Sequence, residues 1–90
     1  MKAAKKKKAY FVYVLCNDMG ILYTGIAKDI EARLALHNMG EGAKFTRGRG
    51  PWRLVHREGR FAHGAALKRE IALKRDRRFK AALKAALGLV

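Results

Sequence analysis

The stretch YFVYVLCNDMGILYTGI, residues 10–26, decides the fold. Its first part, residues 10–15, is apolar on both alternating faces and rich in aromatic and β-branched side chains, which is typical of a strand buried on both sides. The four residues NDMG, 17–20, are a turn signal, and residues 21–26 are a second strand of the same kind. The stretch therefore predicts a β-hairpin.

A helix and a loop are predicted after the hairpin. Asp29 is a suitable N-cap for a helix that runs to about Asn38, because a short carboxylate can accept the free N–H groups of the first turn. Asn38 and Gly40 are stop signals. From residue 40 to residue 50, four glycines alternate with basic side chains, which predicts a mobile cationic loop on the surface.

The remaining sequence predicts one strand and two helices. Alternation places Trp52, Leu54 and His56 on one face of a strand over residues 52–58, before a break at Gly59 and Arg60. Helices are expected over residues 62–74 and 76–87. The order β-β-α-β-α-α predicts an α+β fold, with a small, mostly antiparallel three-stranded sheet flanked by helices.

Charge and length limit what this chain does. Its 90 residues suit one domain, which we expect over residues 9–90 after a flexible basic arm, 1–8. A formal charge of +14 points to a polyanionic partner, of which nucleic acid is the leading candidate and a membrane is not expected. The single cysteine, Cys16, excludes an intrachain disulfide, and we expect a cytoplasmic protein, associated with the nucleoid in a bacterium.

The first predicted helix carries two polar residues on its inner face. At 100° per residue, Arg33 and His37 share a sector with the aliphatic residues Ile30 and Leu34. One interpretation is that Arg33 extends to solvent and that His37 lies near the helix end, where a cation is favoured. The other is that both groups belong to a functional site.

The second predicted helix carries one carboxylate, Glu70, within its apolar stripe (Ala66, Leu67, Ile71 and Leu73). A buried carboxylate needs a partner. Either Glu70 pairs with Arg33 or a nearby lysine, or it serves as a metal ligand or general base. If the strands of the hairpin pair about the turn at 17–20, Tyr13 and Tyr23 can lie near each other across the ladder, where a core role is the usual one for tyrosine.

These five groups together suit one reaction, the hydrolysis of a phosphodiester. It needs an activated water, a cation on the phosphate oxygens and stabilisation of the leaving oxygen. One carboxylate is sufficient to hold Mg²⁺, because water and substrate phosphate supply its other ligands. A general base at Tyr13 would need surrounding cations to stabilise its phenolate, and the basic sequence supplies them.

The sequence also resembles the GIY-YIG nuclease superfamily, in particular its small single-domain, UPF0213-like branch. The resemblance rests on FVY at residues 11–13, YTG at 23–25, Arg33 with His37, GAKFTR at 42–47 with RGPW at 49–52, and ALKRE at 66–70. It implies that Tyr13 is the general base and that Tyr23 and His37 support the water or the leaving group. It also implies that Arg33 binds the scissile phosphate and that Glu70 holds Mg²⁺ or Mn²⁺.

We therefore expect a divalent-metal-dependent endonuclease that cuts DNA and selects structure rather than sequence, for example branched or single-stranded DNA. RNA stays open as a substrate, and a protein partner could supply specificity. The alternative is a catalytically inactive module that keeps the fold and binds nucleic acid. Basic side chains expected to contact nucleic acid are Lys44, Arg47, Arg49, Arg53, Lys68, Arg69 and Lys74.

Overall fold

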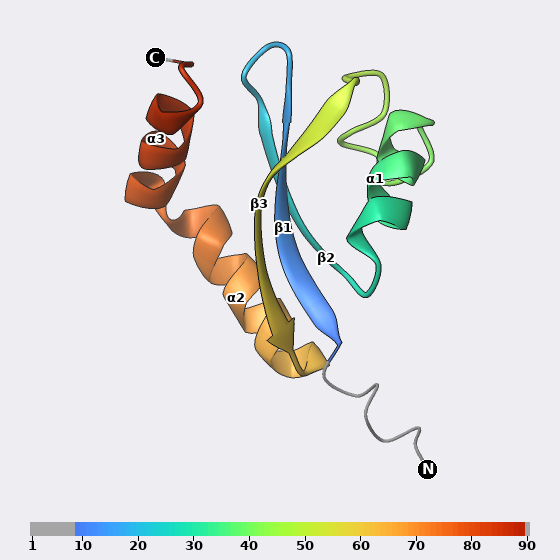
Figure 1. Cartoon of the computed structure of the whole chain (residues 1–90), viewed down its shortest axis with the longest axis vertical. Coiled ribbons are helices and arrows are strands. Elements are labelled where there is room, and N and C mark those ends of the chain that lie inside the picture. The colour runs from blue at the N-terminus through green and yellow to red at the C-terminus, as the bar shows by residue number, and fades with distance from the viewer. Residues whose placement is uncertain (1–8, 90) are drawn as a thin grey trace.

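The computed structural model describes residues 9–89 (Figure 1). The predicted basic arm, residues 1–8, lies outside the described residues. The elements are β1 (Tyr10–Asn17), β2 (Leu22–Ala27), α1 (Ile30–Asn38), β3 (Trp52–Phe61), α2 (His63–Arg75) and α3 (Arg77–Ala86). One sheet with the order β2-β1-β3 is antiparallel throughout, so the predicted fold class and element order are confirmed.

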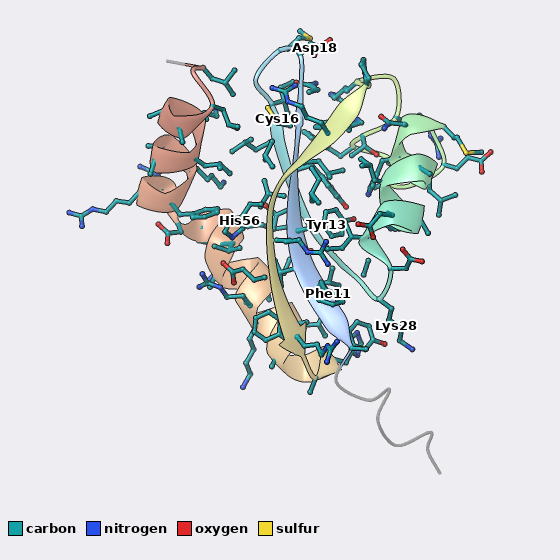
Figure 2. All side chains as sticks on the ribbon, viewed as in Figure 1. Phe11, Tyr13, Cys16, Asp18, Lys28 and His56 are labelled. Carbon is teal, nitrogen blue, oxygen red and sulfur yellow. The ribbon has the colours of Figure 1, made fainter. Side chains whose placement is uncertain are left out.

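The sheet separates two layers of helices, with α1 on one face and α2 on the other, continued by α3 (Figure 1). The core on the α1 side contains Tyr13 and Leu15, whereas the core on the α2 side contains Val12. Figure 2 shows Tyr13 between the sheet and α1, and His56 on the side of α2. The central strand β1 is therefore buried on both faces, as its apolar sequence predicts.

The predicted turn of the hairpin is held by one buried side chain. Asn17 Oδ1 accepts the backbone N–H groups of Met19 at 3.0 Å and Ile21 at 2.9 Å. Its Nδ2 donates to the carbonyl of Arg49 at 2.9 Å. Asn17 therefore fixes the turn and also ties it to the loop before β3.

Strand β3 differs from the prediction in its length and in its faces. It continues through Gly59 to Phe61 instead of ending at residue 58. A register shift between Val14 and Leu15 separates the pairs Val14 with His56 and Leu15 with Leu54. Such a bulge moves the following residues to the other face. As a result His56 packs against Phe79 of α3, and the prediction that it shares a face with Leu54 is wrong.

The helices begin where the sequence predicts. Asp29 accepts the N–H of Ala32 at 3.0 Å, and Asp76 accepts that of Phe79 at 2.9 Å, so both carboxylates are N-caps. Among residues 9–89, no helix combines the length and the apolar composition needed to cross a membrane.

The predicted apolar stripe of α2 is only half correct. Ala66 and Leu73 are buried against the sheet, whereas Leu67 is 40% exposed and Ile71 is 49% exposed. Residues 66 and 73 lie two turns apart on one line of the helix, and residues 67 and 71 are turned by about 100° to 160° from it. The contact of α2 with the sheet is therefore narrower than the sequence pattern indicates.

Candidate active site

The ring of Tyr13, a residue of β1, lies over the backbone of the outer strand β2. Tyr13 pairs with Gly25 across β1 and β2. A Cβ atom on Gly25 would lie 2.6 Å from Tyr13 Oη and 2.8 Å from Cζ. The phenol ring thus occupies the space that a side chain at position 25 would fill. Gly25 is needed here for close approach, and it lets the hydroxyl reach toward the β2 edge of the sheet.

A chain of buried hydrogen bonds begins at this hydroxyl. Tyr13 Oη lies 2.8 Å from His37 Nε2, and His37 Nδ1 lies 2.8 Å from Thr46 Oγ1. The hydroxyl of Thr46 donates to the carbonyl of Ala43 at 3.0 Å. Tyr13 and His37 are each 1% exposed and Thr46 is 0% exposed. We call this the Tyr13–His37–Thr46 chain; it joins β1, α1 and the loop before β3.

The inner side of the loop over residues 40–50 is fixed against α1. Gly42 packs so closely on the His37 ring that a Cβ atom would overlap Nδ1. Arg33 donates to the carbonyl of Gly42 at 3.3 Å, and Trp52 Nε1 donates to that of Thr46 at 3.0 Å. The loop predicted to be mobile and cationic on the surface is thus anchored on its buried side by these bonds.

Thr46 is a site residue that the sequence analysis missed. In the sequence it stands only within the segment 42–47, and the family resemblance assigns it no role. A threonine in a glycine-rich basic loop carries no periodic signal. Its burial follows from contacts with residues that are distant in the sequence, at 37 and 52.

Burial controls the protonation of the two inner groups. It raises the pKa of Tyr13 to about 12, although the nearby Arg33 guanidinium acts in the opposite direction. Burial also lowers the pKa of His37, and the positive charge of Arg33 lowers it further. Near neutral pH, Tyr13 is therefore protonated and His37 is uncharged. The expectation that the basic surroundings would favour a phenolate is wrong, because desolvation outweighs them.

Arg33 and Tyr23 lie around the buried chain. Arg33 is one helical turn before His37, which places both on the inner face of α1 as predicted. The Tyr23 ring lies 5.0 Å from the His37 ring and 6.5 Å from the Tyr13 ring, measured between centroids. Both Arg33 and Tyr23 are half-buried. The site thus has a buried inner layer and a partly open rim.

Glu70 comes from α2, on the opposite face of the sheet. Its negative charge contributes to the raised pKa of Tyr13, and α2 packs against both β1 and β2. Oε2 lies 3.2 Å from Lys74 Nζ, with Glu70 17% and Lys74 51% exposed. The predicted pairing with a lysine is thus observed; that lysine is half in solvent, whereas the carboxylate is mostly buried.

A pocket of about 300 Å³ lies along the outer strand β2 beside these groups. Tyr23 and Phe45 line it with parallel rings whose centroids are 6.0 Å apart. Lys74 and Lys80 line it from the side of α2 and α3. Its lining therefore combines aromatic surface with positive charge.

The basic residues predicted to contact nucleic acid differ in how they are engaged. Arg69 binds both carboxylate oxygens of Glu58, at 2.6 Å and 3.0 Å, so its guanidinium joins α2 to β3. Arg53 lies 3.6 Å from Asp18, and Arg49 covers the Phe45 ring at 4.7 Å. Lys44, Arg47 and Lys68 are exposed.

A divalent ion would find a single carboxylate at this site. Within residues 9–89, no three His, Cys, Asp or Glu side chains form a group that could hold a metal ion. Mg²⁺ commonly binds through one or two carboxylates and substrate phosphates. The lysine ammonium beside Glu70 already marks a position where a cation is accommodated. Glu70 therefore fits the limited role that such an ion requires.

Comparison with known proteins agrees with this geometry. Residues 9–82 match the family model of the GIY-YIG catalytic domain. A UPF0213 protein of Staphylococcus epidermidis is 52% identical over 66 residues, which are 72% of this chain and 79% of that protein. A UPF0213 protein of Staphylococcus aureus is 49% identical over 67 residues, 73% of this chain and 80% of that protein.

A solved structure is similar as well. The solution NMR structure of a UPF0213 protein from Bacillus halodurans matches with a TM-score of 0.50 and 38% sequence identity, over 86% of this chain and 83% of that chain. The resemblance seen in the sequence is confirmed. The chain belongs to the GIY-YIG family of nuclease-type catalytic domains, in its small single-domain UPF0213-like branch.

Proposed function

We propose that this protein is an endonuclease that hydrolyses DNA phosphodiester bonds with the help of Mg²⁺ or Mn²⁺. The observation that carries the proposal is the 2.8 Å contact between the hydroxyl of Tyr13 and Nε2 of an uncharged His37, beside Arg33. A hydroxyl bonded to a neutral imidazole can pass on its proton as it accepts another. This pair can therefore activate a water molecule without a free phenolate.

In the proposed reaction, Tyr13 takes a proton from the attacking water while its own proton moves to His37 Nε2. The water oxygen attacks phosphorus, the bond to the leaving oxygen breaks, and that oxygen takes up a proton from solvent. Arg33 binds the non-bridging oxygens of the phosphate, where its planar guanidinium can donate two bonds. Tyr23, at the rim, supports the water or the leaving oxygen.

The divalent ion would be held by Glu70. When bound, it would stabilise the negative charge that develops on the phosphate and the leaving oxygen. Lys74 would have to release the carboxylate, which its exposed and flexible side chain permits.

The proposed substrate is DNA chosen by its shape. The chain has a formal net charge of +14, and exposed basic residues such as Lys44 and Lys68 would contact the sugar-phosphate backbone. Backbone contacts read little sequence, so branched or single-stranded DNA is a more suitable substrate than a specific duplex site. RNA is a further candidate substrate, and the cleavage test therefore includes RNA structures.

The test is cleavage of a panel of labelled DNA and RNA structures with Mg²⁺ or Mn²⁺. We expect the wild-type protein to cut at least one of them, and Tyr13→Phe and Glu70→Gln to lose about a hundredfold or more in rate. Tyr10→Phe and Glu31→Gln are matched controls, because Tyr10 packs against His63 and Glu31 pairs with Arg57 on the surface.

Two results would argue against the proposal. Equal cutting by the wild type and both site variants would remove the assigned roles. Salt-sensitive binding without cutting by any protein would instead favour the catalytically inactive binding module.

A further inference from the structure

We infer that Thr46 is a positioning residue, whose hydroxyl holds His37 in the tautomer with hydrogen on Nδ1 and leaves Nε2 free to accept from Tyr13. The inference rests on the proposed function for its catalytic meaning, but the tautomer itself is a property of the folded chain. It assigns a structural role to the loop segment 42–47, which the sequence analysis identifies only through its resemblance to the family.

The assignment follows from counting hydrogens along the buried chain. The carbonyl oxygen of Ala43 can only accept, and it lies 3.0 Å from Thr46 Oγ1. Thr46 has one hydroxyl hydrogen, so donating it to Ala43 leaves the threonine oxygen as an acceptor for His37. Nδ1 of His37, 2.8 Å away, must then carry the hydrogen of that bond.

The other end of the imidazole is fixed by the same count. A neutral histidine has one N–H, so hydrogen on Nδ1 leaves a lone pair on Nε2. Tyr13 Oη lies 2.8 Å from Nε2 and therefore donates to it. In this arrangement every donor in the chain has an acceptor. Among the described residues, no buried side-chain nitrogen or oxygen lacks a hydrogen-bond partner.

The opposite tautomer would leave a conflict. Hydrogen on Nε2 would point at Tyr13, and Nδ1 would require the hydroxyl hydrogen of Thr46. The oxygens of Thr46 and Ala43 would then face each other at 3.0 Å without a hydrogen between them. In a site with almost no solvent, such an unpaired acceptor is costly.

The position of Thr46 is itself fixed by its surroundings. Trp52, 3% exposed, donates from its indole to the carbonyl of Thr46 at 3.0 Å. The N–H of Ala43 donates to Thr46 Oγ1 at 3.3 Å, and Gly42 lets the loop approach the His37 ring. The threonine is thus presented to the imidazole from a rigid frame.

The tautomer decides whether the proposed proton transfer is allowed. With the lone pair on Nε2, the proton of Tyr13 has an acceptor as Tyr13 takes one from water. His37 then becomes an imidazolium whose Nδ1–H stays bonded to Thr46. With hydrogen already on Nε2, this route is closed. Thr46 acts only through His37 and does not touch the reacting atoms.

The direct test is nitrogen-15 NMR of the full chain labelled at histidine, near neutral pH. The wild-type protein should show His37 with hydrogen on Nδ1. Thr46→Ser, which keeps the hydroxyl, should show the same tautomer, whereas the isosteric Thr46→Val should show a mixture or the opposite one. His56 and His63 lie outside the chain of bonds and are internal controls that should not change.

Cleavage of the best DNA substrate is the second readout. Thr46→Val should lose about ten- to a hundredfold in rate, as expected when a residue that orients a histidine is removed. Thr46→Ser should retain most of the wild-type rate. A pattern of loss in Val and recovery in Ser separates hydroxyl positioning from general destabilisation.

The outcomes distinguish this inference from the proposed function. Hydrogen on Nε2 of His37 in the wild-type protein would overturn the inference, and this measurement does not depend on any variant that fails to fold. An unchanged tautomer and rate in Thr46→Val would also overturn it. If the wild type cuts nothing but shows the Nδ1–H tautomer, the proposed function fails while the structural assignment stands.

Discussion

Replacing Gly25 with alanine should displace the phenol ring of Tyr13. The added Cβ would lie 2.6 Å from Tyr13 Oη, whereas ordinary contacts begin at 3.4 Å, so the ring must move by about 3.4 − 2.6 = 0.8 Å. The backbone of Gly25 is not in the left-handed region, so the effect comes from the collision alone.

The magnitude follows from what the ring loses when it moves. It cannot move toward His37, because that ring already lies 2.8 Å from the hydroxyl and is held by Thr46 and Gly42. Movement away would stretch the bond from 2.8 Å to about 3.6 Å, beyond hydrogen-bonding range. Overpacking costs about 1–3 kcal/mol and a broken buried bond about as much, so we expect a loss of about 2–6 kcal/mol in unfolding free energy.

Urea unfolding followed by circular dichroism measures this loss, and cleavage of DNA measures its effect on the site. Gly64→Ala is a matched control, because nothing lies within 4 Å of its Cβ position in α2; it should be neutral or more stable by up to about 1 kcal/mol. In a Tyr13→Phe background, Gly25→Ala should cost less, since the nearest clashing atom is gone. A Gly25→Ala protein with wild-type stability and activity would refute the placement of the ring over this glycine.

Two further predictions concern pH. Hydrogen bonds from Arg69 hold the pKa of Glu58 at about 2 instead of 4.5, so the unfolded chain binds a proton that the native protein does not as pH falls below 4.5. About 2 kcal/mol of stability, after allowing for the half-exposed guanidinium, should be lost between pH 4.5 and 2. In Glu58→Gln, the midpoint of urea unfolding should depend less on pH over that range. His37 should titrate below its usual pKa of 6.5, and the cleavage rate should fall only as pH drops through that lower value; NMR titration of Arg33→Gln should show the His37 pKa moving up, because a repelling charge is removed. A normal pKa for His37 in the wild-type protein would contradict its burial.

Local patterns were sufficient for the elements and for the inner-face placement of two candidate residues, Arg33 and His37. The hairpin, the Asp29 N-cap and the inner positions of Arg33 and His37 follow from periodicity and turn chemistry over fewer than a dozen residues each. These signals are strong because the central strand is apolar on both faces and because a cation on an inner helix face is unusual.

The features that were missed depend on contacts between distant segments. A bulge at Val55 of β3, which is skipped in the pairing with β1, decides which face His56 occupies, and the alternation of residues 52–58 does not report it. Burial of Tyr13 outweighs the surrounding cations, and the sequence gives the charges but not the solvent exposure. Thr46 becomes a partner of His37 because contacts from Trp52 and Arg33 hold the loop in place.

In the part of the chain that the structure describes, the outer position of β2 leaves one edge of the sheet without a partner strand, which can favour self-association. A strand that is paired on one side only can recruit a strand from another chain, and proteins often protect it by covering it. If DNA binds along β2, no other segment of the chain can cover this edge. Lys74 and Lys80 beside β2 repel other copies of this cationic chain, so self-association should increase when salt screens that repulsion.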